Sequence, residues 1–143
     1  MSVLDSSSLE RAAAQLEKSY GFLNSKEAER DPDLREQFRG AAIQAFECTY
    51  DLAVKMIRRR LEQIVPNPPE LRGIAFMDLI RTAADAGLVR EAPPFKVYRE
   101  MRNITSHTYA PDKAEEVVGV VRDFLEDLRF LLEELRKRNR ERD

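Results

Sequence analysis

Apolar residues recur at every third or fourth position along most of this chain, and prolines separate one such stretch from the next. This spacing places apolar side chains on one face of an α-helix, whereas a half-buried strand would alternate at every second residue. Glycine, which weakens helices, accounts for only five of the 143 residues, and the helix-favouring Ala, Leu, Glu, Arg and Lys are abundant. The pattern therefore predicts an all-α protein.

The periodic stretches predict five helices, two of them long. The predicted boundaries are Ser7 or Ser8 to between Gly21 and Asn24, Pro32 to Val65, Leu71 to Ala86, a short helix that begins at Pro93, and Pro111 to Asn139. Residues 25–32 are expected to form a polar loop. The prolines within residues 66–69 must end the second helix, because proline lacks an N–H donor and clashes with the preceding turn.

The last predicted helix carries the widest apolar stripe. Its members are Val117, Val118, Val121, Phe124, Leu125, Leu128, Leu131, Leu132 and Leu135. A stripe this wide is typical of a helix packed in a bundle, since a coiled coil needs only a narrow seam. The length of 143 residues fits one domain with its own core. We therefore expect a single domain over residues 1–143, folded as an up-and-down bundle of four to five helices.

Two local patterns predict where helices begin. Ser7, followed three residues later by Glu10, has the form of a capping box. Asp31 and Asp33 flank Pro32. Acidic residues and a first-turn proline both favour a helix start, and neither a preceding Gly-Ser pair nor a strand pattern supports a catalytic Asp-x-Asp motif here.

The composition excludes several classes of protein. The single cysteine, Cys48, rules out a disulfide framework within the chain, and its mid-helix position predicts a packed thiol. One histidine leaves too few ligands for a His-based metal site, and no cofactor motif is present. No apolar run approaches the roughly 20 residues of a membrane span, and no signal peptide is read, so we expect a cytoplasmic protein without a membrane partner. The net charge of -2 gives no reason to expect DNA binding.

One polar segment, Arg102 to Tyr109, combines side chains suited to phosphate chemistry. Arginine carries a permanent positive charge and a fork of donors that matches a phosphate, and histidine exchanges a proton near neutral pH. Arg102 and His107 are therefore candidates for phosphodiester cleavage, with His107 as acid or base and Arg102 stabilising the developing charge. If the helix persists this far, Ser106 shares a face with Arg102, and Asn103 shares one with His107.

The same residues also fit a purely structural role. An arginine and a histidine at a helix end often cap carbonyl groups or pair with acids. Cleavage by internal attack, in contrast, needs one group to take a proton and another to return one. A single chain offers only His107 for this work. The catalytic interpretation therefore predicts a homodimer that brings two copies of the segment together.

Three segments resemble the HEPN superfamily, and within it the nucleotidyltransferase substrate-binding proteins, also described as the HEPN toxins of HEPN–MNT toxin–antitoxin modules. Residues 9–16 resemble the family's first helix. Residues 46–55 are similar to its Phe-Glu-x-Thr-Tyr-Glu-Leu-Ala-Trp-Lys signature, with Asp51 in place of the second Glu and Val54 in place of the Trp. Residues 102–109 fit its Arg-x4-His-x-Tyr motif, the most specific of the three.

The resemblance implies a metal-independent endoribonuclease that cleaves RNA as a homodimer. Arg102 and His107 would match the catalytic pair, and Asn103 a position often counted with the site. Ser106 is expected to support them. Tyr109 would match the tyrosine to which a partner antitoxin, a minimal nucleotidyltransferase (MNT), attaches AMP. The added charge and bulk would repel and block RNA.

Two other functions stay open at this point. In the first, the chain is a non-catalytic subunit that docks on a separate nucleotidyltransferase and presents a substrate to it. In the second, the chain is a helical dimerisation module in which Arg102 and His107 only cap a helix.

Overall fold

The computed structural model describes residues 3–142, and within that range every regular element is a helix. The elements are α1 (Ser7–Leu23), α2 (Lys26–Arg30), α3 (Pro32–Ile64), the 3-10 helix η1 (Pro68–Leu71), α4 (Phe76–Asp85), α5 (Pro93–Ile104), the 3-10 helix η2 (Thr105–His107), α6 (Pro111–Val118) and α7 (Val121–Arg142). The predicted all-α bundle is confirmed, with α3 and α7 as its long helices. None of the described helices combines the length and apolarity needed to cross a membrane.

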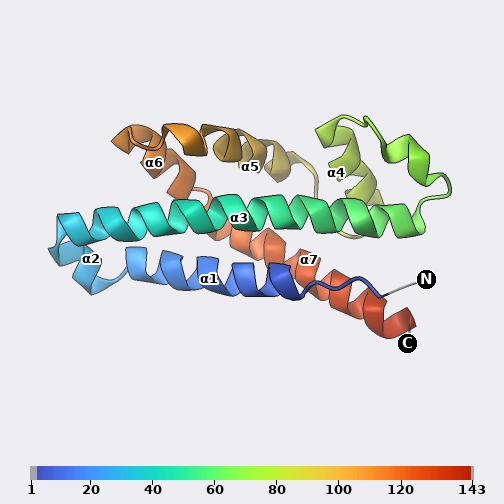
Figure 1. Cartoon of the computed structure of the whole chain (residues 1–143), viewed down its shortest axis with the longest axis horizontal. Helices are drawn as coiled ribbons and strands as arrows, with labels where there is room; N and C mark the ends of the chain where they lie inside the picture. The colour runs from blue at the N-terminus through green and yellow to red at the C-terminus, as the bar shows by residue number, and fades with distance from the viewer. Residues whose placement is uncertain (1–2, 143) are drawn as a thin grey trace.

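Helix α3 runs through the middle of the bundle (Figure 1). Helix α1 lies antiparallel beside it, α7 crosses behind both, and α5 and α6 cover the side of α3 away from α1. Helix α4 packs near the end of α3. The chain between α5 and α6 therefore lies toward the end of the bundle opposite to the two chain termini.

Aromatic side chains from α3, α5 and α7 meet in the core. The ring of Phe124 packs edge-on against Phe46 and Tyr98, with centroid distances of 5.0 and 5.1 Å. Phe95 packs edge-on against Tyr98 at 5.2 Å. All four side chains are buried. Because large rings must interlock to fill a core, this cluster fixes how α5 is rotated about its axis and which of its residues are directed toward α3.

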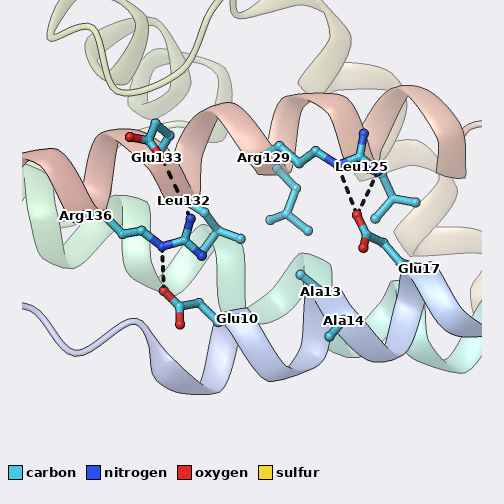
Figure 2. A pocket seen from close by; sticks show the side chains of 10 residues that line it. Glu10, Ala13, Ala14, Glu17, Leu125, Arg129, Leu132, Glu133 and Arg136 are labelled. Carbon is cyan, nitrogen blue, oxygen red and sulfur yellow. Dashed lines mark hydrogen bonds and ion pairs between the residues drawn. The ribbon is translucent and has the colours of Figure 1, made fainter.

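Helix α1 is fastened to α3 and α7 by different contacts. On the α3 side, the buried hydroxyl of Thr49 donates to a carbonyl of α1 at 3.2 Å. On the α7 side, Glu10 pairs with Arg136 and Glu17 pairs with Arg129 (Figure 2). Leucines of α7 line the pocket between these two ion pairs. These ion pairs are exposed and so contribute little to stability individually.

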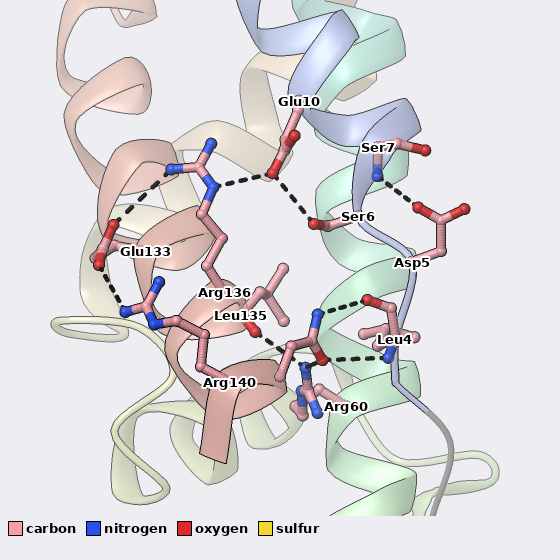
Figure 3. Close-up of polar contacts among 11 residues, drawn as sticks. Leu4, Asp5, Ser6, Ser7, Glu10, Arg60, Glu133, Leu135, Arg136 and Arg140 are labelled. Atoms are coloured by element: carbon pink, nitrogen blue, oxygen red, sulfur yellow. Dashed lines mark hydrogen bonds and ion pairs between the residues drawn. The ribbon is translucent and has the colours of Figure 1, made fainter. Parts of the chain in front are cut away.

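One arginine is entirely buried near the chain termini. Nη2 of Arg60 donates to the carbonyl of Leu135 at 3.2 Å and to the side-chain oxygen of Asn139 at 2.7 Å (Figure 3). Asn139 also exchanges two hydrogen bonds with the backbone of Leu4. Arg60 is the last of three consecutive arginines, residues 58–60, and its side chain joins α3, α7 and the segment before α1.

The two predicted helix starts have different outcomes. Asp31 caps α3 as predicted, because its Oδ1 accepts the N–H groups of Asp33 and Leu34 at 3.1 and 3.2 Å. The capping box predicted from Ser7 is wrong. Ser7 already lies inside α1, and its N–H is bound by the carboxylate of Asp5 at 2.9 Å.

The loop predicted over residues 25–32 contains the short helix α2. The hydroxyl of Ser25 accepts the N–H of Ala28 at 3.3 Å and so caps this helix. The side chain of Ala28 is buried. A helix of five residues is too short to show apolar periodicity, which explains why the sequence pattern did not reveal it.

Of the predicted helices, the third is shorter than expected and the last is divided. The third begins at Phe76 and not at Leu71, because Gly73, at φ 72°, takes a left-handed conformation that interrupts the chain between η1 and α4. The last predicted helix breaks at Gly119. The N–H of Val120 donates to the carbonyl of Val117 at 3.2 Å, a 3-10 contact that ends α6. Helix α7 then continues in a different direction (Figure 1).

Candidate functional site

The polar segment singled out in the sequence begins in the last turn of α5. Tyr98 is buried against Phe124 of α7 and fixes the rotation of α5. Arg102 follows one turn later and lies on the same face. Its guanidinium is therefore directed toward α3 and donates hydrogen bonds to Asp51 of that helix.

Helix α5 does not persist through the whole segment. It ends at Ile104 and tightens into the 3-10 helix η2. The condition under which Ser106 would share a face with Arg102, and His107 with Asn103, is therefore not met, because a 3-10 helix winds with three residues per turn.

Arg102 is held by a carboxylate of α3. Its Nε and Nη2 donate to the two oxygens of Asp51 at 2.9 and 3.0 Å, which forms a bidentate pair. Its Nη1 donates to the hydroxyl of Thr105 at 3.2 Å. Glu47 lies one turn before Asp51, 3.6 Å from Nη2. The side chain of Arg102 stays 30% exposed, so a ligand in solution can still reach the guanidinium.

More negative than positive charge surrounds the guanidinium of Arg102. One guanidinium faces the carboxylates of Asp51 and Glu47. The hydrogen bond from Asp51 raises the pKa of Arg102 above its usual high value, so the side chain is a permanent cation. Of the two structural roles predicted for Arg102, the structure therefore shows pairing with acids and not capping of the α5 carbonyls.

His107 and Tyr109 lie next to each other on the surface. Their ring centroids are 6.4 Å apart and their planes make an angle of 70°. Tyr109 is 85% exposed, and His107 is exposed as well. The turn that carries them is held by Ala110, whose N–H donates to the His107 carbonyl, and by Thr108, whose hydroxyl donates to the Thr105 carbonyl. The imidazole and the phenol are thus both accessible to another molecule.

The predicted site residues therefore fall into two groups. Arg102 is bound to α3, whereas His107 contacts Tyr109. Asn103 and Ser106 are exposed between these groups. An exposed amide and an exposed hydroxyl are free to form hydrogen bonds with a ligand that spans the segment.

Sequence reasoning did not find the partners of Arg102, which are Asp51, Glu47 and Thr105. A signal for two of them was present, because Glu47 and Asp51 are four residues apart and share a face of α3. The residues just before them, Phe46 and Tyr50, point into the core. The sequence does not show, however, that the acidic face of α3 meets the end of α5.

Within the part of the chain that the structure describes, no group of three or more His, Cys, Asp or Glu side chains is placed to hold a metal ion. The packed thiol predicted for Cys48 is wrong, since the side chain is exposed. The core-facing positions around it are taken by Phe46, Thr49 and Tyr50, which leaves Cys48 on the outer face of α3.

A protein-family model described as "nucleotidyltransferase substrate binding protein like" matches residues 4–137. This chain belongs to that family. The match spans both the α3 signature and the polar segment of α5 and η2. The family resemblance drawn from the sequence is therefore confirmed.

Named and solved relatives of this family member extend over nearly its whole length. "Probable ribonuclease HepT" of Haemophilus influenzae is 37% identical over 142 residues, which is 97% of this chain and 93% of the relative. The solved structure of HI0074 from Haemophilus influenzae, described as revealing the fold of a substrate-binding domain of a nucleotidyltransferase, is 34% identical, with a TM-score of 0.87 over 92% of this chain and 99% of that one. A crystal structure from Thermus thermophilus is 28% identical, with a TM-score of 0.71 over 90% and 98%.

The structure also accounts for two positions at which this nucleotidyltransferase substrate-binding family member departs from the signature. Asp51, where the signature has Glu, still places a carboxylate against Arg102. Val54, where the signature has Trp, is half-buried against the core. The first departure preserves an interaction, and the second reduces the bulk of a packing residue.

Proposed function

We propose that this protein is a single-domain toxin of a HEPN–MNT toxin–antitoxin module, and that it acts in the cytoplasm as a metal-independent endoribonuclease. The observation that carries the proposal is the placement of a carboxylate-held guanidinium, Arg102, and an exposed imidazole, His107, in consecutive turns at one helix end. The relative named as a probable ribonuclease supports it.

The proposed chemistry is internal attack on the RNA backbone. A ribose 2′-hydroxyl attacks the adjacent phosphorus, the bond to the 5′-oxygen breaks, and a 2′,3′-cyclic phosphate and a 5′-hydroxyl result. One imidazole takes the proton of the 2′-hydroxyl, and another returns a proton to the leaving oxygen. Arg102 stabilises the charge that develops on the non-bridging oxygens. Asn103 and Ser106 supply hydrogen bonds to the RNA. This scheme needs no metal ion, because side chains supply the base, the acid and the positive charge.

The two imidazoles come from two chains. Since each chain contributes one His107, we propose a homodimer in which the two η2 turns face one shared RNA-binding cleft. The exposed position of His107 and Tyr109 supports such an arrangement, because neither ring is covered within its own chain. Analytical ultracentrifugation tests the dimer directly, and a monomer at micromolar concentration would contradict it.

The nuclease proposal is tested by incubating the purified protein with RNA in the presence of EDTA. We expect the wild type to cleave and His107→Ala to lose activity by roughly 10²-fold or more, the usual contribution of general acid–base catalysis. Arg129→Ala serves as the matched control, because it removes an exposed ion pair between α1 and α7. Equal cleavage by the wild type and His107→Ala would overturn the proposal.

Tyr109 is the proposed site of control by a partner nucleotidyltransferase. The phenol oxygen attacks the α-phosphorus of ATP, loses its proton and releases pyrophosphate, which leaves AMP on the ring. The new phosphodiester carries a negative charge next to His107, so it repels RNA as well as covering the cleft. The 85% exposure of Tyr109 supports this role, since a transferase must reach the oxygen from outside.

The modification is tested by co-expression with a minimal nucleotidyltransferase. Mass spectrometry of the purified chain is expected to show AMP on Tyr109 and no modification in Tyr109→Phe. The modified protein should also lose RNA cleavage. Unmodified Tyr109 in the presence of an active transferase and ATP would contradict the proposal.

A second candidate function is a non-catalytic subunit that presents a substrate to a nucleotidyltransferase. It is favoured by the description of the family and of the HI0074 fold, and by the two carboxylates that face Arg102. Co-purification with a transferase, together with the absence of RNA cleavage by the dimer alone, would establish this function in place of the first.

A further inference from the structure

We infer that Asp51 is a positioning residue, which holds one edge of the Arg102 guanidinium so that its other edge faces the scissile phosphate. The inference rests on the proposed ribonuclease function. It concerns a residue outside the Arg102 to Tyr109 segment, on a different helix and 51 positions away from Arg102 in the sequence.

The first argument is the geometry of the pair. A guanidinium has five N–H donors in a fixed plane. Asp51 takes the Nε donor at 2.9 Å and one Nη2 donor at 3.0 Å, so it occupies the edge of the group that faces α3. Thr105 takes one Nη1 donor at 3.2 Å. These bonds leave one N–H on each terminal nitrogen, and Glu47, at 3.6 Å from Nη2, lies beyond hydrogen-bond distance. Two N–H groups are the number that a phosphate accepts in a bidentate contact.

The second argument is that Arg102 is fixed from both sides. The Thr105 side chain is buried, and its hydroxyl donates to the Arg102 carbonyl at 2.8 Å while accepting from Nη1. Asp51 belongs to α3 and Thr105 to η2, so two elements of the bundle hold the same cation. A long arginine side chain loses much rotamer freedom when it is fixed, and the bonds to Asp51 and Thr105 reduce that freedom before RNA arrives.

The third argument concerns charge, and it separates positioning from simple attraction. Asp51 is 55% exposed and negatively charged, so it repels an approaching phosphate even as it orients Arg102. A residue retained for RNA affinity alone would not carry that charge. Removing the charge should therefore leave RNA binding unchanged or tighter, while the rate of the chemical step falls because Arg102 is no longer aimed.

The experiment compares Asp51→Asn, Asp51→Ala and Asp51→Glu with the wild type, with kcat and KM measured separately on a fluorescent RNA oligonucleotide. We expect Asp51→Asn and Asp51→Ala to lower kcat by roughly 10- to 100-fold with KM unchanged or reduced. Asp51→Glu, which restores the acid of the family signature, should recover most of kcat. Asp78→Asn is the matched control, because Asp78 forms an exposed ion pair with Arg81 on α4, away from the α5–α6 junction.

Each outcome decides the inference. A kcat that is unchanged in Asp51→Asn and Asp51→Ala, or that rises in them, overturns it, since Asp51 is then a bystander or a competitor for Arg102. A raised KM at constant kcat also overturns it. Circular dichroism melting of each variant checks that an exposed substitution has left the fold intact. Absence of cleavage by the wild type itself would defeat the ribonuclease proposal and this inference together, whereas an active wild type with an indifferent Asp51 defeats the inference alone.

Discussion

Two arginine–aspartate pairs hold this bundle at different places. Nε and Nη2 of Arg90 both donate to Oδ1 of Asp127, at 3.0 and 2.6 Å, whereas the same two nitrogens of Arg102 donate to separate oxygens of Asp51, at 2.9 and 3.0 Å. Asp127 is only 4% exposed, and its second oxygen accepts the hydroxyl of Tyr98. Asp51, in contrast, is more than half exposed.

The two pairs differ in the exposure of the carboxylate and not of the cation, since the Arg90 side chain is 47% exposed and that of Arg102 is 30% exposed. Asp127 is buried and both of its oxygens accept hydrogen bonds, so it ties α7 to Tyr98 of α5 and to the segment just before α5. At Asp51 the carboxylate is exposed and the pair lies in a high-dielectric setting, where ion pairs add little stability. A buried carboxylate thus anchors elements of the bundle, whereas an exposed one holds its arginine with little effect on stability.

The largest expected effect is the loss of cleavage in Arg102→Ala. Removing the cation should lower kcat by roughly 10²- to 10³-fold, as deletion of a transition-state donor does in other enzymes. Because the pair with Asp51 is exposed, the free energy of unfolding should change by less than about 1 kcal/mol. RNA cleavage assays and urea denaturation of the same preparation separate the two effects, with Arg129→Ala as the control. A large loss of stability would show that Arg102 is an anchor after all.

The converse experiment is Asp127→Ala. This change removes a buried carboxylate and leaves the hydroxyl of Tyr98 without its acceptor, which should cost about 2–3 kcal/mol of folding free energy. The fraction that remains folded should cleave RNA normally. Urea denaturation measures the loss, and a value below about 1 kcal/mol would contradict the contrast between the two pairs.

Tyr98→Phe tests the buried hydrogen bond between Tyr98 and Asp127 through the pH dependence of folding stability. Burial, reinforced by the hydrogen bond to Asp127, raises the pKa of Tyr98 above its unfolded value of about 10. A raised pKa means that the stability contribution is complete below pH 10 and is lost as the pH rises, because the unfolded chain ionises first. The free energy of unfolding of the wild type should therefore fall more than that of Tyr98→Phe between pH 9 and 11. At neutral pH the variant should be about 1–2 kcal/mol less stable than the wild type. Parallel curves in thermal melts across this range would contradict the prediction.

The smallest expected effect lies at an exposed pair between α3 and α6. Hydrogen bonds from Arg35, at 2.6 and 3.2 Å, lower the pKa of Glu115 below its usual value. A lowered pKa means that the contribution is present above about pH 4.5 and is lost as the pH falls through the folded value. Since both partners are more than a third exposed, Glu115→Gln should cost at most about 1 kcal/mol at pH 7 and less at pH 3. Denaturation at the two pH values measures this difference. A loss that is equally large at pH 3 would assign the effect to packing.

The long helices could be predicted from the sequence because their apolar faces repeat over many turns. Helix α3 begins at Pro32 and ends before the prolines of residues 66–69, as the pattern requires. The short elements depend on single contacts instead. Helix α2 depends on a Ser25 cap and a buried Ala28, and the break at Gly119 is a change of direction that leaves the periodicity on both sides almost intact.

The candidate site shows the same division. The segment of Arg102 and His107 is recognisable because its residue types are concentrated in one short stretch. The link from Arg102 to Asp51 joins residues 51 positions apart and depends on how α5 is rotated against α3. Arg60 is a second example, since nothing in a basic run predicts that one of its members is fully buried against the carbonyl of Leu135.

The anchoring of Tyr98 in the core one turn before Arg102 has a consequence for length changes in this chain. Each residue added to an α-helix rotates everything after it by about 100°. One residue inserted or deleted between Tyr98 and Arg102 would therefore swing the guanidinium away from α3, while leaving the composition of the polar segment unchanged. The same change ahead of Pro93 would leave the interval between Tyr98 and Arg102 unaltered. The four-residue interval between ring and guanidinium is thus as strict a requirement as either side chain.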